Sequence, residues 1–329
     1  MKEFVKEIDI RELSGFLIGN AEYREAATGC TAILCPSGAV AGVDVRGSAP
    51  ASRETELLKP VNMIEQIHCV MLSGGSAFGL EAGDGAMQYL EEKGYGFETG
   101  FGKVPIVCGA SLFDLATGRS DVRPDKALGY AACQAAFERQ PLCQGNFGAG
   151  TGASVGKYLG PDRMMKGGLG IHAIQAGNVK CAAIVAVNCL GDVSDPETGK
   201  VLAGILNEEK NGVASTCDLM LADMAEARDV FKGNTTLGCI LTNARLTKSQ
   251  CNKLASITHN AYARTISPVH TSADGDTIFV MTTAEEEAAP DSLGVLAVRA
   301  MEKAIAKAVL YAEPVYGIRA ASELTPQKG

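Results

Sequence analysis

The amino-acid sequence predicts an α/β protein built from layers of sheet and helix. Strand-like and helix-like segments alternate along the 329 residues without an internal repeat. The apolar fraction is 46% and the charged fraction is 21%, a composition typical of a globular protein with a substantial core. Small residues are abundant, with 38 glycines and no tryptophan, which favours closely packed layers joined by glycine turns.

Hydrophobic periodicity places the individual elements. The predicted strands cover residues 31–34, 40–45, 68–72, 180–190, 237–242 and 277–282, with a turn at 36–38 between the first two. The segment 180–190 is almost entirely apolar, which predicts burial on both faces. The predicted helices cover residues 76–92, 124–139, 216–231, 247–265 and 291–311. The polar, glycine-containing segment 191–212 predicts a surface loop.

Charge and cysteine usage exclude several classes of function. The net charge of −8 gives no electrostatic reason to expect a nucleic acid or an anionic membrane as partner. The eleven cysteines include no Cys-x-x-Cys pair, and several stand in apolar runs, which indicates buried thiols in a reducing compartment. Neither a signal segment nor a membrane-spanning stretch is visible. We therefore expect a soluble, cytoplasmic protein.

The histidines and the glycine-dense segment 145–157 could suggest a metal or a nucleotide. The four histidines show no metal-ligand spacing, although His270 stands close to an acidic pair. The glycine segment misses both the dinucleotide-binding and the phosphate-loop spacing by one residue. We therefore predict neither a metal nor a cofactor.

The bond between Asn234 and Thr235 lies in a small polar turn just before a predicted buried strand. If this bond is cut, the nitrogen of Thr235 becomes an amine with a reference pKa of about 7.7–8.0. Such an amine can act as the general base for its own hydroxyl group. The residues alone leave open an ordinary strand start with Asn and Thr in the turn.

Three ordered motifs carry a family resemblance: Gly233-Asn-Thr-Thr236, Leu72-Ser-Gly-Gly-Ser-Ala-Phe-Gly-Leu80 and Gly148-Ala-Gly-Thr-Gly152. They resemble the L-aminopeptidase/D-esterases, β-aminopeptidases and nylon-oligomer hydrolases over nearly the whole chain. The resemblance implies a layered αββα sandwich of the aminopeptidase and ornithine-acetyltransferase type, formed by one catalytic domain (1–329). It also implies self-cleavage into an α chain (1–234) and a β chain (235–329), and a homo-oligomer of αβ units.

The resemblance also implies the site residues. Thr235 matches the nucleophile, Asp274 and Asp276 the acidic pair, Asn188 the oxyanion-hole amide, and Lys157 a lysine near the nucleophile. Two carboxylates separated by one glycine can share a cation such as the new Thr235 ammonium, and a side-chain amide at an oxyanion is worth roughly 2.7–4 kcal/mol in other hydrolases. A solvated acidic turn, a strand-end Asn and a solvated loop Lys remain as alternatives.

These assignments predict an amidohydrolase or aminopeptidase that cleaves small peptides or amides through a Thr235 acyl-enzyme. The aminopeptidase branch has Ser at the nucleophile and Ser and Glu at the acidic pair, so the physiological amide stays open. It has a Tyr where this chain has Phe113, whose ring has no hydroxyl to donate, so a tyrosine-assisted step does not carry over. An ornithine-acetyltransferase-like acyl transferase and an uncleaved, non-catalytic scaffold are the alternatives. A transferase would need an acceptor amine and would not hydrolyse its donor without one. A scaffold would never cleave itself and would remain one full-length chain.

Overall fold

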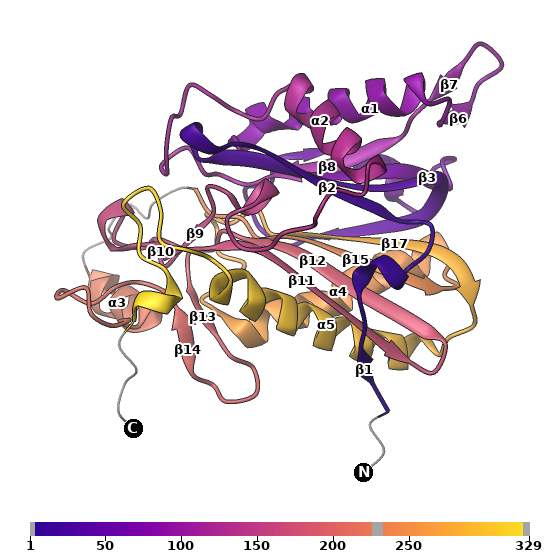
Figure 1. Cartoon of the computed structure of the whole chain (residues 1–329). Coiled ribbons are helices and arrows are strands. Elements are labelled where there is room, and N and C mark those ends of the chain that lie inside the picture. Colours follow the sequence, from indigo (N-terminus) through magenta and orange to yellow (C-terminus); the bar gives the residue numbers. More distant parts are fainter. Residues whose placement is uncertain (1–3, 226–232, 325–329) are drawn as a thin grey trace.

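The described part of the chain forms one continuous 10-stranded β-sheet that divides at a long shared strand into two halves. These halves, called here the first and second sheets, pack face to face with helices on both outer surfaces (Figure 1). The computed structural model describes residues 4–225 and 233–324. The first sheet contains, in hydrogen-bonded order, β1 (Lys6–Glu7), β11 (Gly168–Ala176), β12 (Val179–Val187), β15 (Leu237–Ala244), β17 (Thr277–Glu286) and β3 (Thr28–Val45). The second contains β2 (Leu17–Tyr23), β3, β5 (Gln66–Ser73), β8 (Val107–Ser111) and β4 (Ser52–Arg53).

The long strand β3 belongs to both sheets. Its second half, from Val40 to Val45, pairs with β17 in the first sheet. Its first half pairs with β2 and with β5 in the second sheet, and the pairing with β5 continues to Ala39 and Val40. The register shifts between Leu34 and Ala39, where the strand passes from one sheet to the other. The turn predicted at residues 36–38 is therefore wrong, because the chain keeps its direction there and bulges.

Two pairs of helices cover the sandwich. The helices α1 (Ala82–Glu92) and α2 (Lys126–Phe137) lie over the second sheet, and α4 (Lys248–Thr265) and α5 (Pro290–Leu310) lie over the first (Figure 1). The side chain of Thr247 caps α4 by accepting from the Gln250 N–H, and Pro290 occupies the first turn of α5. The shorter α3 (Thr216–Ala222) follows the segment predicted as a loop.

Apolar side chains fill all three spaces between the layers. Strand β12 shows how one strand serves two of them, since alternate residues point to opposite faces. Ile184 packs between the two sheets, and its neighbour Val185 packs toward α4 and α5. A third cluster, which includes Leu34 and Leu90, lies between the second sheet and its helices. The predicted αββα layering and the burial of 180–190 on both faces are confirmed.

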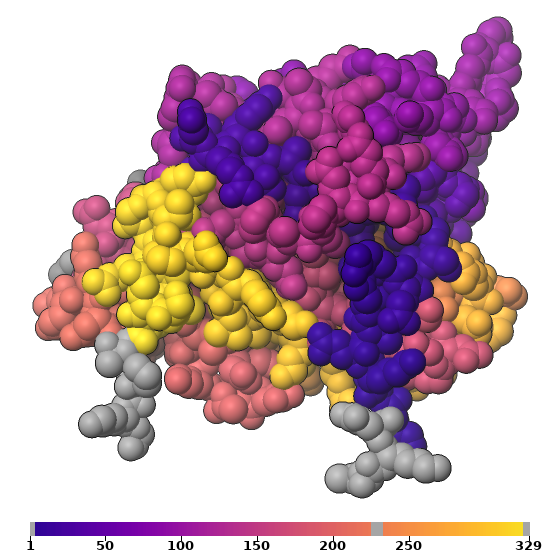
Figure 2. Space-filling view, viewed as in Figure 1, coloured from indigo at the N-terminus to yellow at the C-terminus, as the bar shows by residue number. Residues whose placement is uncertain are grey.

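Smaller pairings lie outside the two large sheets. They are β6 (Phe97–Glu98) with β7 (Lys103–Val104), β9 (Ser154–Val155) with β10 (Met165–Lys166), and β13 (Asp192–Ser194) with β14 (Val201–Ala203) and β16 (Ile266–Ser267). The β6–β7 hairpin stands clear of the surrounding surface (Figure 2). Short 3₁₀ helices occur at Ile10–Glu12, Arg24–Ala26, Glu56–Leu58, Ser76–Glu81, Gly148–Gly150, Pro161–Arg163, Asp223–Ala225 and Ala321–Glu323.

Some predicted elements differ from the structure. The segment 191–212 contains β13 and β14, because its apolar residues Val193 and Ala203 face the core while the polar residues form the connection between them. The helix predicted over 76–92 begins with a 3₁₀ helix and becomes an α-helix at Ala82. The helix predicted over 216–231 ends at Ala222 and continues as a 3₁₀ turn to Ala225; the remainder lies outside the described residues. Strands β2, β8 and β11 were not predicted.

Candidate active site

The ends of three strands meet at one edge of the first sheet. Strands β15 and β17 are parallel, with Leu237 opposite Thr277, so both begin at this edge. Strand β12 runs antiparallel to β15 and ends there. Asn188 follows β12, Thr235 precedes β15, and the segment 274–276 precedes β17. The sheet topology therefore brings together site residues that are far apart in sequence.

Thr235 is buried at this edge, with 4% of its surface exposed. Its backbone N–H donates to the backbone oxygen of Asn188 at 2.9 Å. Its hydroxyl donates to the carbonyl oxygen of Asn234, which also accepts the N–H of Gly275 at 3.0 Å. Two donors therefore hold the carbonyl of the predicted cleavage site, and one of them is the predicted nucleophile.

Lys157 is buried beside the same peptide. Its Nζ donates to the backbone oxygens of Asn188 at 2.9 Å and of Gly233 at 2.7 Å. The oxygen of Asn188 therefore connects the lysine to the Thr235 N–H. Burial lowers the pKa of Lys157 from 10.5 to about 7, although negative groups such as Asp274 oppose this shift. With 1% exposure, the alternative of a solvated loop lysine is wrong, and the amine can exchange a proton near neutral pH.

The acidic pair is also buried, with 1% exposure for each residue, so the alternative of a solvated turn is wrong. Asp276 Oδ1 accepts the Thr236 N–H at 2.7 Å. Asp274 Oδ2 accepts the N–H of Thr271 at 2.7 Å and its hydroxyl at 2.6 Å, whereas Asp274 Oδ1 has no hydrogen-bond partner among the described residues. Burial, together with the charge of Asp276, raises the pKa of Asp274 to about 6. The pair can therefore accept both a hydrogen bond and a proton.

The side chain of Asn188 is anchored between strand β9 and the segment that follows β8. Its Oδ1 accepts the Ser154 N–H at 3.0 Å, and its Nδ2 donates to the backbone oxygen of Phe113 at 2.9 Å. The Phe113 ring packs against Gly233, where an added Cβ would lie 2.5 Å from the ring. It is the backbone oxygen of Asn188 that contacts Thr235. The predicted role of its amide at an oxyanion remains a prediction.

Two glycine motifs meet at a buried carboxylate that was not predicted from the sequence. Asp114 accepts the Gly75 N–H and the Thr28 hydroxyl, each at 2.7 Å. A Cβ on Gly74 would lie 2.0 Å from Asp114 Oδ2, and a Cβ on Gly152 would lie 2.8 Å from the Asp114 Cβ. These glycines are therefore required for close packing. The signal in the sequence was a single acidic residue inside an apolar run.

A second buried lysine supports the glycine-dense segment. Lys166 Nζ donates to the backbone oxygens of Thr151 at 2.9 Å and Ala153 at 2.7 Å. Burial lowers its pKa to about 7, with Asp114 acting in the opposite direction. This lysine, like Asp114, was not predicted from the sequence. The segment 148–156 is buried and leads directly to Lys157.

Comparison with known proteins identifies the family. The model of peptidase family S58 matches residues 9–322. The chain belongs to this family. An uncharacterized aminopeptidase of Mycobacterium leprae is 36% identical over 340 residues, which cover 94% of this chain and 92% of that protein. A 6-aminohexanoate-oligomer endohydrolase of Kocuria sp. is 35% identical over 277 residues, or 83% of this chain and 74% of that enzyme. The predicted resemblance is confirmed, and the chain is an enzyme of an aminopeptidase and amide-hydrolase family.

Solved structures support the same fold for this S58 enzyme. The L-aminopeptidase D-Ala-esterase/amidase of Ochrobactrum anthropi, described as a variant of the N-terminal-nucleophile hydrolase fold, superposes with a TM-score of 0.69 at 16% identity, covering 95% of this chain and 91% of that one. A Burkholderia sp. β-aminopeptidase superposes with a TM-score of 0.67 at 17% identity, covering 95% and 90%. The predicted α/β sandwich is therefore confirmed.

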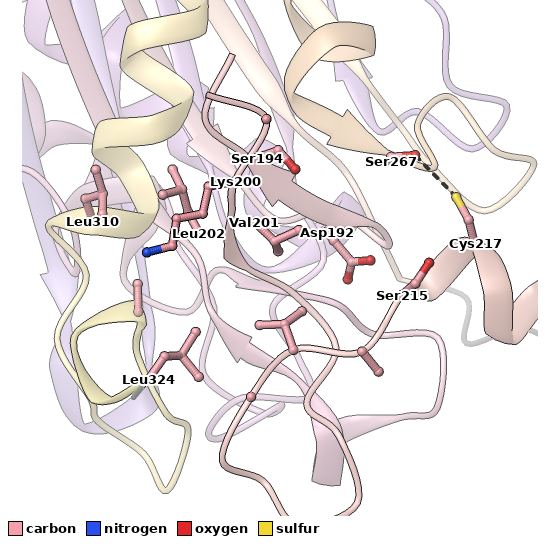
Figure 3. Close-up of a pocket in the computed structure, with 15 residues that line it drawn as sticks. Asp192, Ser194, Lys200, Val201, Leu202, Ser215, Cys217, Ser267, Leu310 and Leu324 are labelled. Carbon is pink, nitrogen blue, oxygen red and sulfur yellow. Dashed lines mark hydrogen bonds between the residues drawn. The ribbon is translucent and has the colours of Figure 1, made fainter. Parts of the chain in front are cut away.

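A separate pocket of about 630 Å³ lies beyond strand β13 in this S58 enzyme (Figure 3). Asp192, Ser194, Cys217 and Ser267 line it together with apolar residues such as Leu310, whereas Thr235 and its neighbours do not. Within residues 4–225 and 233–324, no group of three or more His, Cys, Asp or Glu side chains could hold a metal ion. No helix in these ranges is both long and apolar enough to cross a membrane.

Proposed function

We propose that this family S58 enzyme cuts its own Asn234–Thr235 bond and then hydrolyses small peptides or amides through Thr235. The observation that supports this most directly is the Asn234 carbonyl, which accepts both the Thr235 hydroxyl and the Gly275 N–H. Attack on a carbonyl places negative charge on its oxygen, and the Gly275 N–H is already placed to stabilise that charge. The contact of the Thr235 hydroxyl with the same carbonyl shows that the nucleophile lies beside the bond to be cut. The surroundings of this peptide therefore favour attack by its neighbouring hydroxyl.

In the self-cleavage step the Thr235 oxygen attacks the carbonyl carbon of Asn234. The nitrogen of Thr235 is still an amide and cannot accept the hydroxyl proton. We assign this role to Lys157, because its Nζ lies beside this peptide, on the backbone oxygens of Asn188 and Gly233, and burial lowers its pKa to about 7. The C–N bond then breaks, the nitrogen takes up the proton, and Asn234 is left as an ester on Thr235. Water hydrolyses this ester, which leaves a carboxylate on Asn234 and a free amine on Thr235.

In the proposed turnover the new amine of Thr235 is the general base. Asp274 Oδ1, which lacks a hydrogen-bond partner in the described ranges, can accept a hydrogen bond from this amine when the amine carries a proton. Asn188 and Gly275 would donate to the oxyanion, and the charge of Lys157 would help to neutralise it. The names of the relatives, an aminopeptidase and a 6-aminohexanoate-oligomer endohydrolase, favour short amides or ω-amino-acid oligomers as substrates.

Intact-mass analysis of the purified protein tests the proposal. We expect two chains, and Edman sequencing of the smaller should begin Thr-Thr-Leu-Gly. Thr235→Ala should remain one inactive chain, and Thr235→Ser should still be processed. A small chain that begins at Thr236, or a Thr235→Ala variant with parental activity, would show that the nucleophile is wrongly assigned.

Substrate and assembly are measured on the processed enzyme. Aminoacyl p-nitroanilides, β-peptides and 6-aminohexanoate oligomers should be turned over in water alone. Turnover that requires an added amine acceptor would indicate acyl transfer instead. We also propose a homo-oligomer of αβ units, which light scattering would detect as a mass of at least two units.

A further inference from the structure

A histidine contacts Oδ2 of the Asp276 carboxylate through both its backbone and its side chain. His270 directs both its backbone N–H, at 3.2 Å, and its ring Nδ1, at 2.8 Å, to Asp276 Oδ2. The other oxygen of this carboxylate accepts the Thr236 N–H at 2.7 Å. One residue thus supplies two contacts to the same oxygen, which restricts rotation of the carboxylate and keeps Oδ1 directed at Thr236.

Side chains from α4 hold the imidazole in place. The His259 ring meets it edge-on with the centroids 4.8 Å apart, and the Tyr262 ring stacks against it at 6.1 Å. The Tyr262 hydroxyl also donates to the backbone oxygen of Thr236 at 3.4 Å. The cluster of His259, Tyr262, His270 and Asp276 therefore contacts both the N–H and the C=O of the residue that follows the nucleophile.

The backbone of His270 also points to a role for its side chain. Its φ of +57° is in the left-handed region, which is uncommon outside glycine and is adopted most readily by Asn, Asp and His. Backbone conformation alone would favour glycine. The ring Nε2 is buried and has no partner in the described part of the chain, so Nδ1 makes the ring's hydrogen bond, to Asp276.

We propose that His270 is a positioning residue for Thr235. It acts through Asp276, whose carboxylate holds the Thr236 N–H and thereby sets the orientation of the Thr235–Thr236 peptide. This inference rests on the proposed role of Thr235. Loss of the His270 side chain should lower the rate of self-cleavage and kcat while KM changes little, since the residue does not contact the substrate.

Two substitutions separate the hydrogen bond from the backbone conformation. His270→Asn keeps a donor near the position of Nδ1 and tolerates a positive φ, so self-cleavage and kcat should stay within about threefold of the parent. His270→Gly also accepts this φ but removes the donor, so both rates should fall about thirtyfold, as expected for one hydrogen bond to a charged group. Lys210→Gly, at an exposed residue with φ +55°, is the matched control and should leave both rates unchanged.

The melting temperature of each variant is measured first. If His270→Gly does not fold, His270→Asp replaces it, since it matches the Asn variant in size and φ but places a like charge beside Asp276; its kcat should fall well below that of His270→Asn. Parental kcat in the Gly or Asp variant, failure of Asn to rescue, or a rise in KM at unchanged kcat would overturn the inference. A parent enzyme without a Thr235 N-terminus would instead overturn the proposed function.

Discussion

Lys157 and Lys166 form a natural comparison within the molecule. Each lysine is buried, donates to two backbone carbonyls, and has its pKa lowered to about 7 by burial. The two lysines differ in which backbone carbonyls accept their hydrogen bonds. Lys157 binds Asn188 and Gly233 beside the Asn234–Thr235 bond, whereas Lys166 binds the glycine-dense segment. A shifted pKa therefore does not by itself identify a catalytic lysine, because a structural lysine can have the same shift.

The largest expected effect separates the two lysines directly. Lys157→Met should slow self-cleavage about a thousandfold, because the proposed base is lost and methionine has a similar shape without a charge. Lys166→Met should leave the rate within about tenfold of the parent. Both variants lose the donor to two buried carbonyls, so their melting temperatures should change to a similar extent. Gel analysis of the precursor over time measures the rates. Equal slowing in both variants would remove the distinction between the lysines.

A smaller effect tests the Asn234–Thr235 peptide, beside which Lys157 lies, without changing a lysine. A Cβ on Gly275 would lie 2.7 Å from the Thr235 hydroxyl oxygen and 2.8 Å from the backbone oxygen of Ala49. Gly275→Ala should therefore displace the Thr235 hydroxyl, the Gly275 N–H or both, and slow self-cleavage about a hundredfold. Gly294→Ala is the control, since its Cβ would meet only the side chain of Ile257, at 3.3 Å. The processed fraction after a fixed time, measured by intact mass, should fall only in the first variant. Normal processing of Gly275→Ala would contradict the arrangement described for the Asn234 carbonyl.

The smallest expected effect concerns the lowered pKa that the two lysines share. Between about pH 7 and 10.5 the folded lysines bind fewer protons than the unfolded chain, so their contribution to the free energy of unfolding rises with pH. The urea concentration at the unfolding midpoint should therefore rise less between pH 7 and pH 8.5 in Lys166→Met than in the parent. Burial raises the pKa values of the buried cysteines, so their contribution to the free energy of unfolding falls at higher pH. This contribution is the same in the parent and in Lys166→Met. An unchanged slope would mean that Lys166 stays protonated when buried.

Much of the fold was predictable because its signals are local. The helices α2, α4 and α5 and the strands β5, β12, β15 and β17 follow from apolar periodicity and end within a few residues of the predicted positions. The strands β2, β8 and β11 were missed, because polar residues, small side chains and glycines such as Gly168 and Gly170 weaken their apolar pattern. In the fold these strands are stabilised by pairing with distant neighbours.

The sequence predicted which residues form the candidate site, but not how these residues are arranged. The resemblance selected Lys157, Asn188, Thr235, Asp274 and Asp276, and the structure brings all five to one edge of the first sheet. It also adds contacts that no motif indicated, such as the N–H of Gly275 on the Asn234 carbonyl. Backbone donors leave no trace in residue type, because every residue other than proline has an N–H.

The sequence by itself determined the layered α/β class, the family, and the position of Thr235 at the start of a buried strand. These properties depend on residue order and on periodicity over a few residues. Only the tertiary structure decided which charges are buried, which lysine adjoins the Asn234–Thr235 bond, and that His270 supports Asp276. These features depend on strand register and on packing between distant segments, and the free energy of burying a charge is set by all of its neighbours together.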